Sequence, residues 1–174
     1  MDAALPKRKN LRLPDYSYDT PGAYFITFCT QQRRNTLSRI VGAIHESPVC
    51  LLSDLGKIVD SVIKNPPPHL NLSIDHYVIM PNHVHLLVTV PITSERAIPE
   101  SPLQKRSEIS KIVGYIKMTS SKAIRQRHGD IPVWQRGFYD HVIRNEQDYC
   151  AIANYINENP LRWKLDKLYM ADLP

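Results

Sequence analysis

Two histidines separated by a single valine stand in a stretch of strand-forming residues, 77–90. Because side chains alternate between the two faces of a strand, His83 and His85 are expected to project to the same side. The apolar residues of the stretch then project to the other side, as a core face does: Val84, Leu86, Val88 and Val90. Two neighbouring imidazoles are typical of part of a metal site; a pair of half-exposed strand histidines is the simpler alternative.

A tyrosine and an asparagine stand four residues apart at the end of the last predicted helix, which Asn145 caps and which runs to about Glu158. Tyr155 and Asn159 therefore share one face, at the edge of the apolar stripe. A tyrosine hydroxyl can attack a phosphodiester and form a covalent phosphotyrosine. Two imidazoles and an amide oxygen can hold a divalent cation that polarises the phosphate. These ligands leave Mg²⁺ and Mn²⁺ both open.

Three other tyrosines compete with Tyr155 for the role of nucleophile. Tyr149 lies on the apolar stripe of the last helix and is expected in the core, whereas Tyr115 lies on a basic helix and could stack on a base. Tyr139 is the most serious rival, because it shares a predicted strand face with His141. Three residues of that segment are candidates for partners of the metal ligands or for phosphate contacts, with a strand-edge ion pair as the alternative: Asp140, His141 and Arg144.

Positive charge is concentrated in two segments of a chain whose net charge is +5. Residues 105–128 hold seven basic residues and one acidic residue, and a second basic cluster lies near the N-terminus. Such clusters favour a polyanionic partner, most simply nucleic acid, although a solvated helix face would look similar. The candidate contacts are Lys7, Arg8, Lys9, Arg12, Lys111, Lys117, Lys122 and Arg125.

The chain has no apolar run near the roughly 20 residues that span a bilayer, and its first residues lack the apolar stretch of a signal peptide. We therefore expect a cytoplasmic protein with no membrane partner. Its three cysteines form no close-spaced pair, which fits a reducing compartment.

The elements that must position these residues alternate in a recognisable order. Strands are predicted at 24–30, 72–80, 83–90 and 133–143, and helices at 53–64, 107–127 and 145–158, with a short hairpin around Gly42. The first six elements match the split βαβ, ferredoxin-like (RRM-like) pattern, an α+β fold with two helices on one face of a four-stranded antiparallel sheet. Both histidines then lie on the other face, within reach of the last helix. Residues 1–20 are predicted to be a basic arm, and residues 21–174 a single domain.

Four stretches of the chain together resemble one family. They are 12–14 with 22–27, Met80 to His85, Trp134 to Arg144, and Tyr155 to Pro160. A bare His-x-His pair is common by chance, but the ordered set is similar to the REP-associated tyrosine transposases, a branch of the single-tyrosine HUH transposases.

The resemblance implies a residue assignment and a reaction. Tyr155 would be the nucleophile, His83 and His85 would be metal ligands, and Asn159 would stand where other HUH transposases have a glutamine as a third metal contact. The implied activity is that of a metal-dependent single-stranded DNA endonuclease and strand transferase. It would leave a 5′-phosphotyrosine and a free 3′-OH on hairpins of repeated extragenic palindromes, with the basic arm and the basic helix as DNA contacts.

Two other functions are compatible with the same sequence. A non-catalytic RNA- or DNA-binding module would carry aromatic stacking platforms on the open face of the sheet, and Tyr24 and Phe25 are candidates. A hydrolase that uses metal-activated water would not need Tyr155. The chain could act as a monomer or a homodimer; the short connection at 144–146 favours a site assembled within one chain.

Overall fold

Four antiparallel strands form the main sheet of the computed structural model, which describes residues 20–42, 48–92 and 107–171. Their order in the sheet is β4-β5-β1-β6. The strands are β1 (Gly22–Cys29), β4 (Ser73–Ile79), β5 (His83–Val90) and β6 (Tyr139–Ile143). This order confirms the predicted ferredoxin-like sheet, in which the first and third strands are central and the second and fourth lie at the edges.

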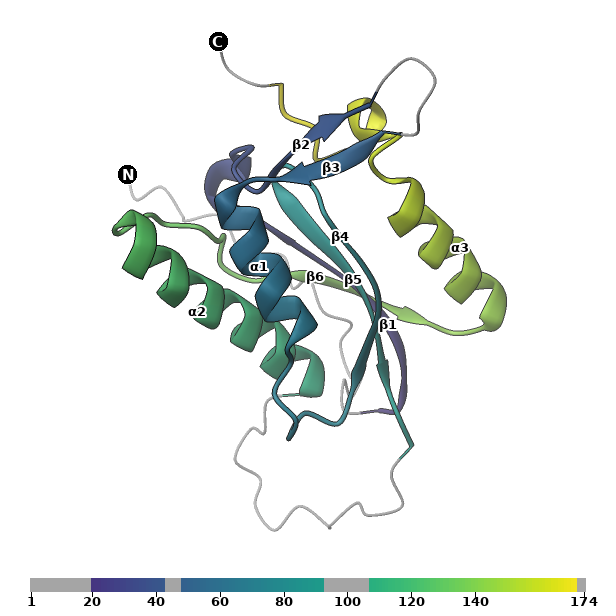
Figure 1. Cartoon of the computed structure of the whole chain (residues 1–174). Helices are drawn as coiled ribbons and strands as arrows, with labels where there is room; N and C mark the ends of the chain where they lie inside the picture. The colour runs from purple at the N-terminus through teal and green to yellow at the C-terminus, as the bar shows by residue number, and fades with distance from the viewer. Residues whose placement is uncertain (1–19, 43–47, 93–106, 172–174) are drawn as a thin grey trace, which may run out of the picture.

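Two helices cover one face of this sheet and the third lies against the other (Figure 1). The first pair is α1 (Asp54–Lys64) and α2 (Glu108–His128), and the third is α3 (Glu146–Glu158). Each begins where a cap side chain accepts a hydrogen bond from the backbone N–H three residues on; the caps are Ser53, Ser107 and Asn145. The predicted bounds of all three helices agree with these to within a residue or two.

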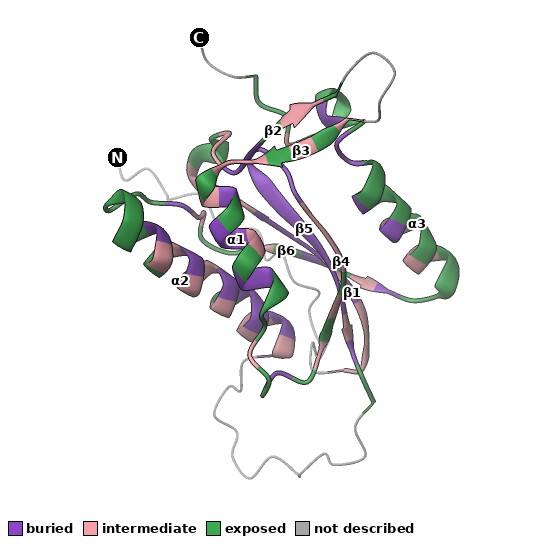
Figure 2. Ribbon diagram, viewed as in Figure 1, coloured by how far each residue is buried: buried purple, intermediate pink, exposed green. Residues whose placement is uncertain are grey.

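Strand β5 is buried on both faces, which explains its nearly continuous apolar sequence (Figure 2). One face contributes Val84, Leu86 and Val88 to the main core under α1 and α2. On the other face, Leu87 packs in a smaller cluster with Ile156 of α3. Helix α3 is therefore held on the histidine side of the sheet by apolar contacts.

A small hairpin formed by β2 (Ser38–Val41) and β3 (Val49–Leu52) precedes α1, as predicted around Gly42. Two 3₁₀ turns, Gln31–Arg33 and Trp163–Leu165, were not predicted. The first turn of α1 approaches the backbone beside the hairpin closely, since a Cβ on Gly56 would lie 2.0 Å from the Leu37 carbonyl oxygen. Glycine is therefore required at this position.

The prediction that the fourth strand begins at Val133 is wrong. Strand β6 begins at Tyr139, and before it only Trp134 forms an isolated bridge, with Thr30. Gly137 has a φ of +83°, which turns the chain away from a strand path. Within the described residues, no helix is both long enough and apolar enough to cross a membrane.

Candidate active site

The two histidines converge through their Nε2 atoms, which lie 3.0 Å apart. Both are buried, with 0% of His83 and 3% of His85 exposed, so they are not the half-exposed pair of the simpler alternative. The Nδ1 atom of His83 lies 2.8 Å from the Asn82 side-chain oxygen. Because the Asn82 amide donates to the Leu168 carbonyl, this oxygen is an acceptor, and His83 Nδ1 carries the proton. The lone pair of His83 is then on Nε2, which faces the Nε2 atom of His85.

The second histidine is oriented from the neighbouring strand. Nδ1 of His85 lies 2.7 Å from the hydroxyl of Thr27 on β1, its directly paired residue. Such contacts fix the ring orientation of metal-binding histidines. Burial lowers the pKa of His83 to about 4 and that of His85 well below its ordinary value. Both imidazoles are neutral at pH 7, as metal ligands must be.

A carboxylate that the sequence reasoning missed completes this cluster. Ligand atoms of His83, His85 and Asp166 all lie within 4.8 Å of one another. One Asp166 oxygen accepts a hydrogen bond of 2.6 Å from the Leu168 N–H. Trp163 is buried three residues earlier, with its ring centroid 5.9 Å from that of His83. A tryptophan followed three residues later by an aspartate is the sequence signal that could have suggested an anchored segment here.

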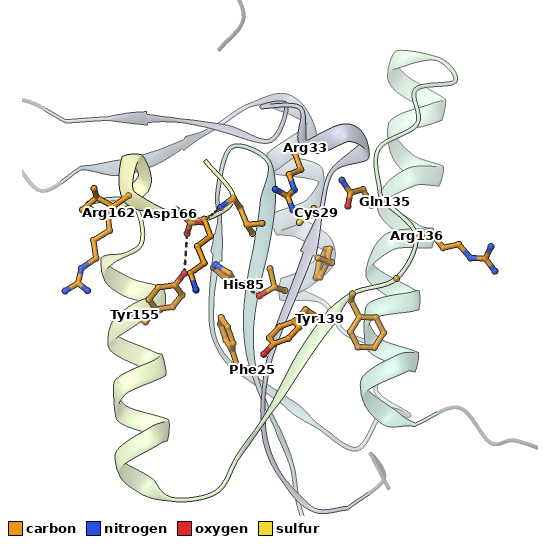
Figure 3. A pocket seen from close by; sticks show the side chains of 17 residues that line it. Phe25, Cys29, Arg33, His85, Gln135, Arg136, Tyr139, Tyr155, Arg162 and Asp166 are labelled. Atoms are coloured by element: carbon orange, nitrogen blue, oxygen red, sulfur yellow. Dashed lines mark hydrogen bonds between the residues drawn. The ribbon is translucent and has the colours of Figure 1, made fainter. Parts of the chain in front are cut away.

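Tyr155 stands beside the cluster, within the same chain. Its hydroxyl donates a hydrogen bond of 3.3 Å to the other Asp166 oxygen, and its ring centroid lies 5.4 Å from that of His85. Figure 3 shows the three side chains of Tyr155, His85 and Asp166 close together on one side of a cavity. Burial first, and then the Asp166 charge, raise the pKa of Tyr155, while the Asn159 amide acts in the opposite direction.

Asn159 lies next to Tyr155, at the end of α3, and is 1% exposed. Its side-chain oxygen accepts no hydrogen bond from the described residues, although it is buried. A buried acceptor without a donor is unfavourable, so this oxygen suits a cation. The two neutral imidazoles and the Asp166 carboxylate form a donor set that fits a divalent metal ion. That Asn159 itself is a ligand stays a prediction.

The predicted residues on β6 divide between the two faces of the sheet. Tyr139 pairs with Thr27, and His141 pairs with Phe25, so both lie on the histidine face. Asp140 pairs with Ile26, a residue of the main core, and therefore lies on the opposite face, away from the histidines. Arg144 is exposed beyond the end of the strand.

Helix α2, which carries four of the predicted basic contacts, lies on the face of the sheet away from α3 (Figure 1). Lys111 pairs with Glu108, and Arg125 pairs with Asp130, while Lys122 is exposed. Lys117 is different, because its ammonium group donates to backbone carbonyl oxygens of Gln135 and Gly137. The four basic residues predicted on the N-terminal arm, at positions 7, 8, 9 and 12, lie outside the described residues.

A cavity of about 810 Å³ opens between α3, the segment after it, and the strands β1 and β6. His85, Tyr155 and Asp166 lie on one side, and Gln135, Arg136 and Tyr139 lie on the other (Figure 3). The cavity lining carries four basic side chains and one acidic side chain, and the sequence reasoning singled out none of them: Arg33, Arg136, Arg162, Lys167 and Asp166. Basic side chains therefore outnumber acidic ones in the cavity lining, although Arg162 forms an ion pair with Glu158.

Comparisons with known proteins agree with the family resemblance. An uncharacterized protein of Haemophilus influenzae is 32% identical over 180 residues, 97% of each chain, so the two belong to one family. A second H. influenzae protein, whose name assigns it provisionally to the REP-associated tyrosine transposases, is 25% identical over 81% of this chain and 71% of its own length. The solved structure of a REP-associated tyrosine transposase bound to a REP hairpin has the same fold, with a TM-score of 0.54 and 22% identity over 87% of this chain and 73% of that chain. No family model matches the sequence.

Proposed function

Because the chain is related to the REP-associated tyrosine transposases in sequence and fold, we propose that it cleaves and rejoins single-stranded DNA beside a hairpin. Tyr155 is the nucleophile of this proposal, and His83 and His85 are its metal ligands. The observation that carries it is the meeting of four elements at one point: the histidine pair of β5, Thr27 of β1, Tyr155 of α3 and Asp166 of the following segment.

In the proposed reaction, the Tyr155 oxygen attacks the scissile phosphorus. A bond between that oxygen and phosphorus forms, and the bond from phosphorus to the 3′-oxygen breaks. The tyrosine proton passes to the Asp166 carboxylate, which already accepts its hydrogen bond, and the leaving 3′-oxygen takes a proton from water. The products are a 5′-phosphotyrosine and a free 3′-OH, which can later attack the phosphotyrosine and rejoin the strand.

His83, His85 and Asp166 would hold a divalent cation, with Asn159 as a further ligand. The cation would supply charge stabilisation to the phosphate oxygens during attack. The protein orients these ligands in the absence of the cation. Burial keeps the imidazoles neutral, and the contacts with Asn82 and Thr27 fix the orientation of their rings. The site would therefore be largely formed before the ion binds.

The test uses a DNA hairpin with an unpaired flank, labelled in separate samples at the 5′ or the 3′ end. In Mg²⁺ or Mn²⁺, the 3′-labelled fragment should become attached to the protein, and the 5′-labelled fragment should be released with a 3′-OH. Tyr155→Phe or a chelator should abolish the adduct. Tyr149→Phe, at the other end of α3, is the matched control.

Three other results would each reject the mechanism in a distinct way. Cleavage without a protein–DNA adduct would indicate metal-activated water. An adduct that survives in Tyr155→Phe and disappears in Tyr139→Phe would move the nucleophile to β6. Binding without cleavage in either metal would favour the non-catalytic binding module.

A further inference from the structure

We propose that the side of the cavity opposite Tyr155 binds one unpaired DNA nucleotide, with its base stacked on Tyr139 and its phosphate held by Arg33. This proposal rests on the proposed function, because the same DNA strand supplies the nucleotide. We call this side, formed by residues 29–33 and 133–139, the far wall.

Hydrogen bonds between its two segments hold the far wall in place. The Gln31 N–H donates to the Val133 carbonyl oxygen at 2.7 Å, and the Gln135 N–H donates to the Cys29 carbonyl oxygen at 3.0 Å. Lys117 reaches from α2 and donates to the Gln135 carbonyl at 2.9 Å. The far wall is therefore a preformed surface, which lowers the entropy lost when a ligand binds.

The backbone at Arg33 has a conformation that non-glycine residues rarely adopt. Gln32 and Arg33 have φ values of +56° and +54°, one after the other. Such conformations persist where the surroundings enforce them, and they are frequent at ligand sites. Here the turn directs Arg33 to the cavity, while its neighbour Arg34 does not line the cavity (Figure 3). The Arg33 charge is close enough to help lower the pKa of His83.

Tyr139 offers an accessible aromatic face at the same cavity. It is 49% exposed on edge strand β6, and it lies on the histidine face of the sheet as the partner of Thr27. Phe25, by contrast, is engaged with His85 and Tyr155, at centroid distances of 5.0 and 5.9 Å. Tyr139 is the most exposed of the described aromatic rings that line the cavity, and only an unstacked base can present its face to it.

The basic side chains that line the cavity favour an anionic ligand. Arg33 forms no ion pair with the described residues, although it is positively charged and lines the cavity. Phosphate is the anion that a nucleotide brings, and arginine binds it with directed hydrogen bonds. An aromatic face and an arginine beside one cavity together fit a nucleotide better than either fits alone.

The test measures binding without chemistry, in the Tyr155→Phe protein with chelator, using a fluorescent hairpin with an unpaired DNA flank. Tyr139→Leu should weaken binding by about 5- to 100-fold, as the loss of one stacked base does. Arg33→Gln should weaken binding. It should also reduce, by about one, the magnitude of the slope of the logarithm of the binding constant against the logarithm of the salt concentration (the salt slope). The matched controls, Tyr149→Leu and Arg34→Gln, should change neither.

A series of flanks, each with a single abasic position, then locates the nucleotide. An abasic site at the position that stacks on Tyr139 should weaken binding to the Tyr155→Phe protein. The same abasic site should have no effect on binding to the double variant Tyr155→Phe, Tyr139→Leu. If every abasic position acts equally in both proteins, the stacking site does not exist, whatever the result of the adduct assay. Tighter binding of an RNA flank of the same sequence would reject DNA as the ligand. If one abasic position weakens binding only when Tyr139 is present, but no protein–DNA adduct ever forms, the nucleotide site exists and the cleavage mechanism is wrong.

Discussion

The Tyr155 hydroxyl donates a hydrogen bond to the Asp166 carboxylate, across a 3.3 Å oxygen–oxygen distance and from a different segment of the chain. This contact joins the candidate nucleophile to the histidine cluster, because Asp166 also lies within reach of both imidazoles. The same carboxylate raises the pKa of Tyr155, after burial, which is the larger cause. A neutral tyrosine at pH 7 must therefore lose its proton during the reaction.

Replacing Asp166 by asparagine should slow formation of the adduct by about 10²- to 10⁴-fold, the range that general base catalysis supplies. The amide retains a hydrogen-bond acceptor but takes no proton and carries no charge. The same change should lower the pKa of Tyr155, because it removes the carboxylate charge that now raises it. Single-turnover adduct rates and an ultraviolet titration of tyrosinate, with Tyr155→Phe as reference, measure the two effects. An unchanged rate would show that Asp166 neither takes the proton nor supports the cation.

The buried histidines predict a specific loss of stability in mild acid. Their pKa values are lowered in the folded protein, to about 4 for His83, from an ordinary value of 6.5. Between pH 6.5 and about 4, the histidines of the unfolded chain are therefore protonated while those of the folded chain remain neutral. The free energy of unfolding should fall as the pH drops from 6.5 toward 4, because unfolding allows both imidazoles to take up protons.

Urea unfolding with chelator, at several pH values, measures this loss. The His83→Gln protein should lose less stability over the same range than the parent protein. The exposed residue His69 supplies the control, since His69→Gln should retain the full slope. Parallel slopes in the parent and His83→Gln proteins would show that His83 is protonated in the folded state.

Local sequence signals predicted most of the fold and most of the candidate site, but not Asp166. Alternation along β5 placed His83 and His85 on one face, and the Asn145 cap with the apolar stripe placed α3. Asp166 escaped prediction because no periodic element carries it; contacts of Trp163 and Leu168 set its position. The start of β6 was missed because the Lys117 contacts that hold residues 135–137 come from a distant helix.

The close approach at Gly56 predicts an unusual response to alanine. Alanine normally stabilises a helix interior over glycine by about 1 kcal/mol. At Gly56, the added Cβ would lie 2.0 Å from the Leu37 backbone oxygen, so Gly56→Ala should destabilise the protein by about 2 kcal/mol or more. Gly114 in α2 is the matched control, because it is exposed and its Cβ would meet nothing within 4 Å. Gly114→Ala should stabilise the protein in the same urea experiment; equal effects at both positions would contradict the close approach.

Lys117 should act on DNA through the far wall and not through its charge. Burial lowers its pKa to about 8, and its ammonium group is engaged with backbone carbonyls, over the Phe28 ring. Lys117→Met should weaken binding of the unpaired flank and reduce the effect of the sensitive abasic position. The salt slope of binding should stay the same, because no phosphate contact is lost. Lys122→Met, which removes an exposed charge on the same helix, should leave the abasic effect intact. A fall of about one in the salt slope for Lys117→Met would instead make Lys117 a phosphate contact, as the sequence alone suggested.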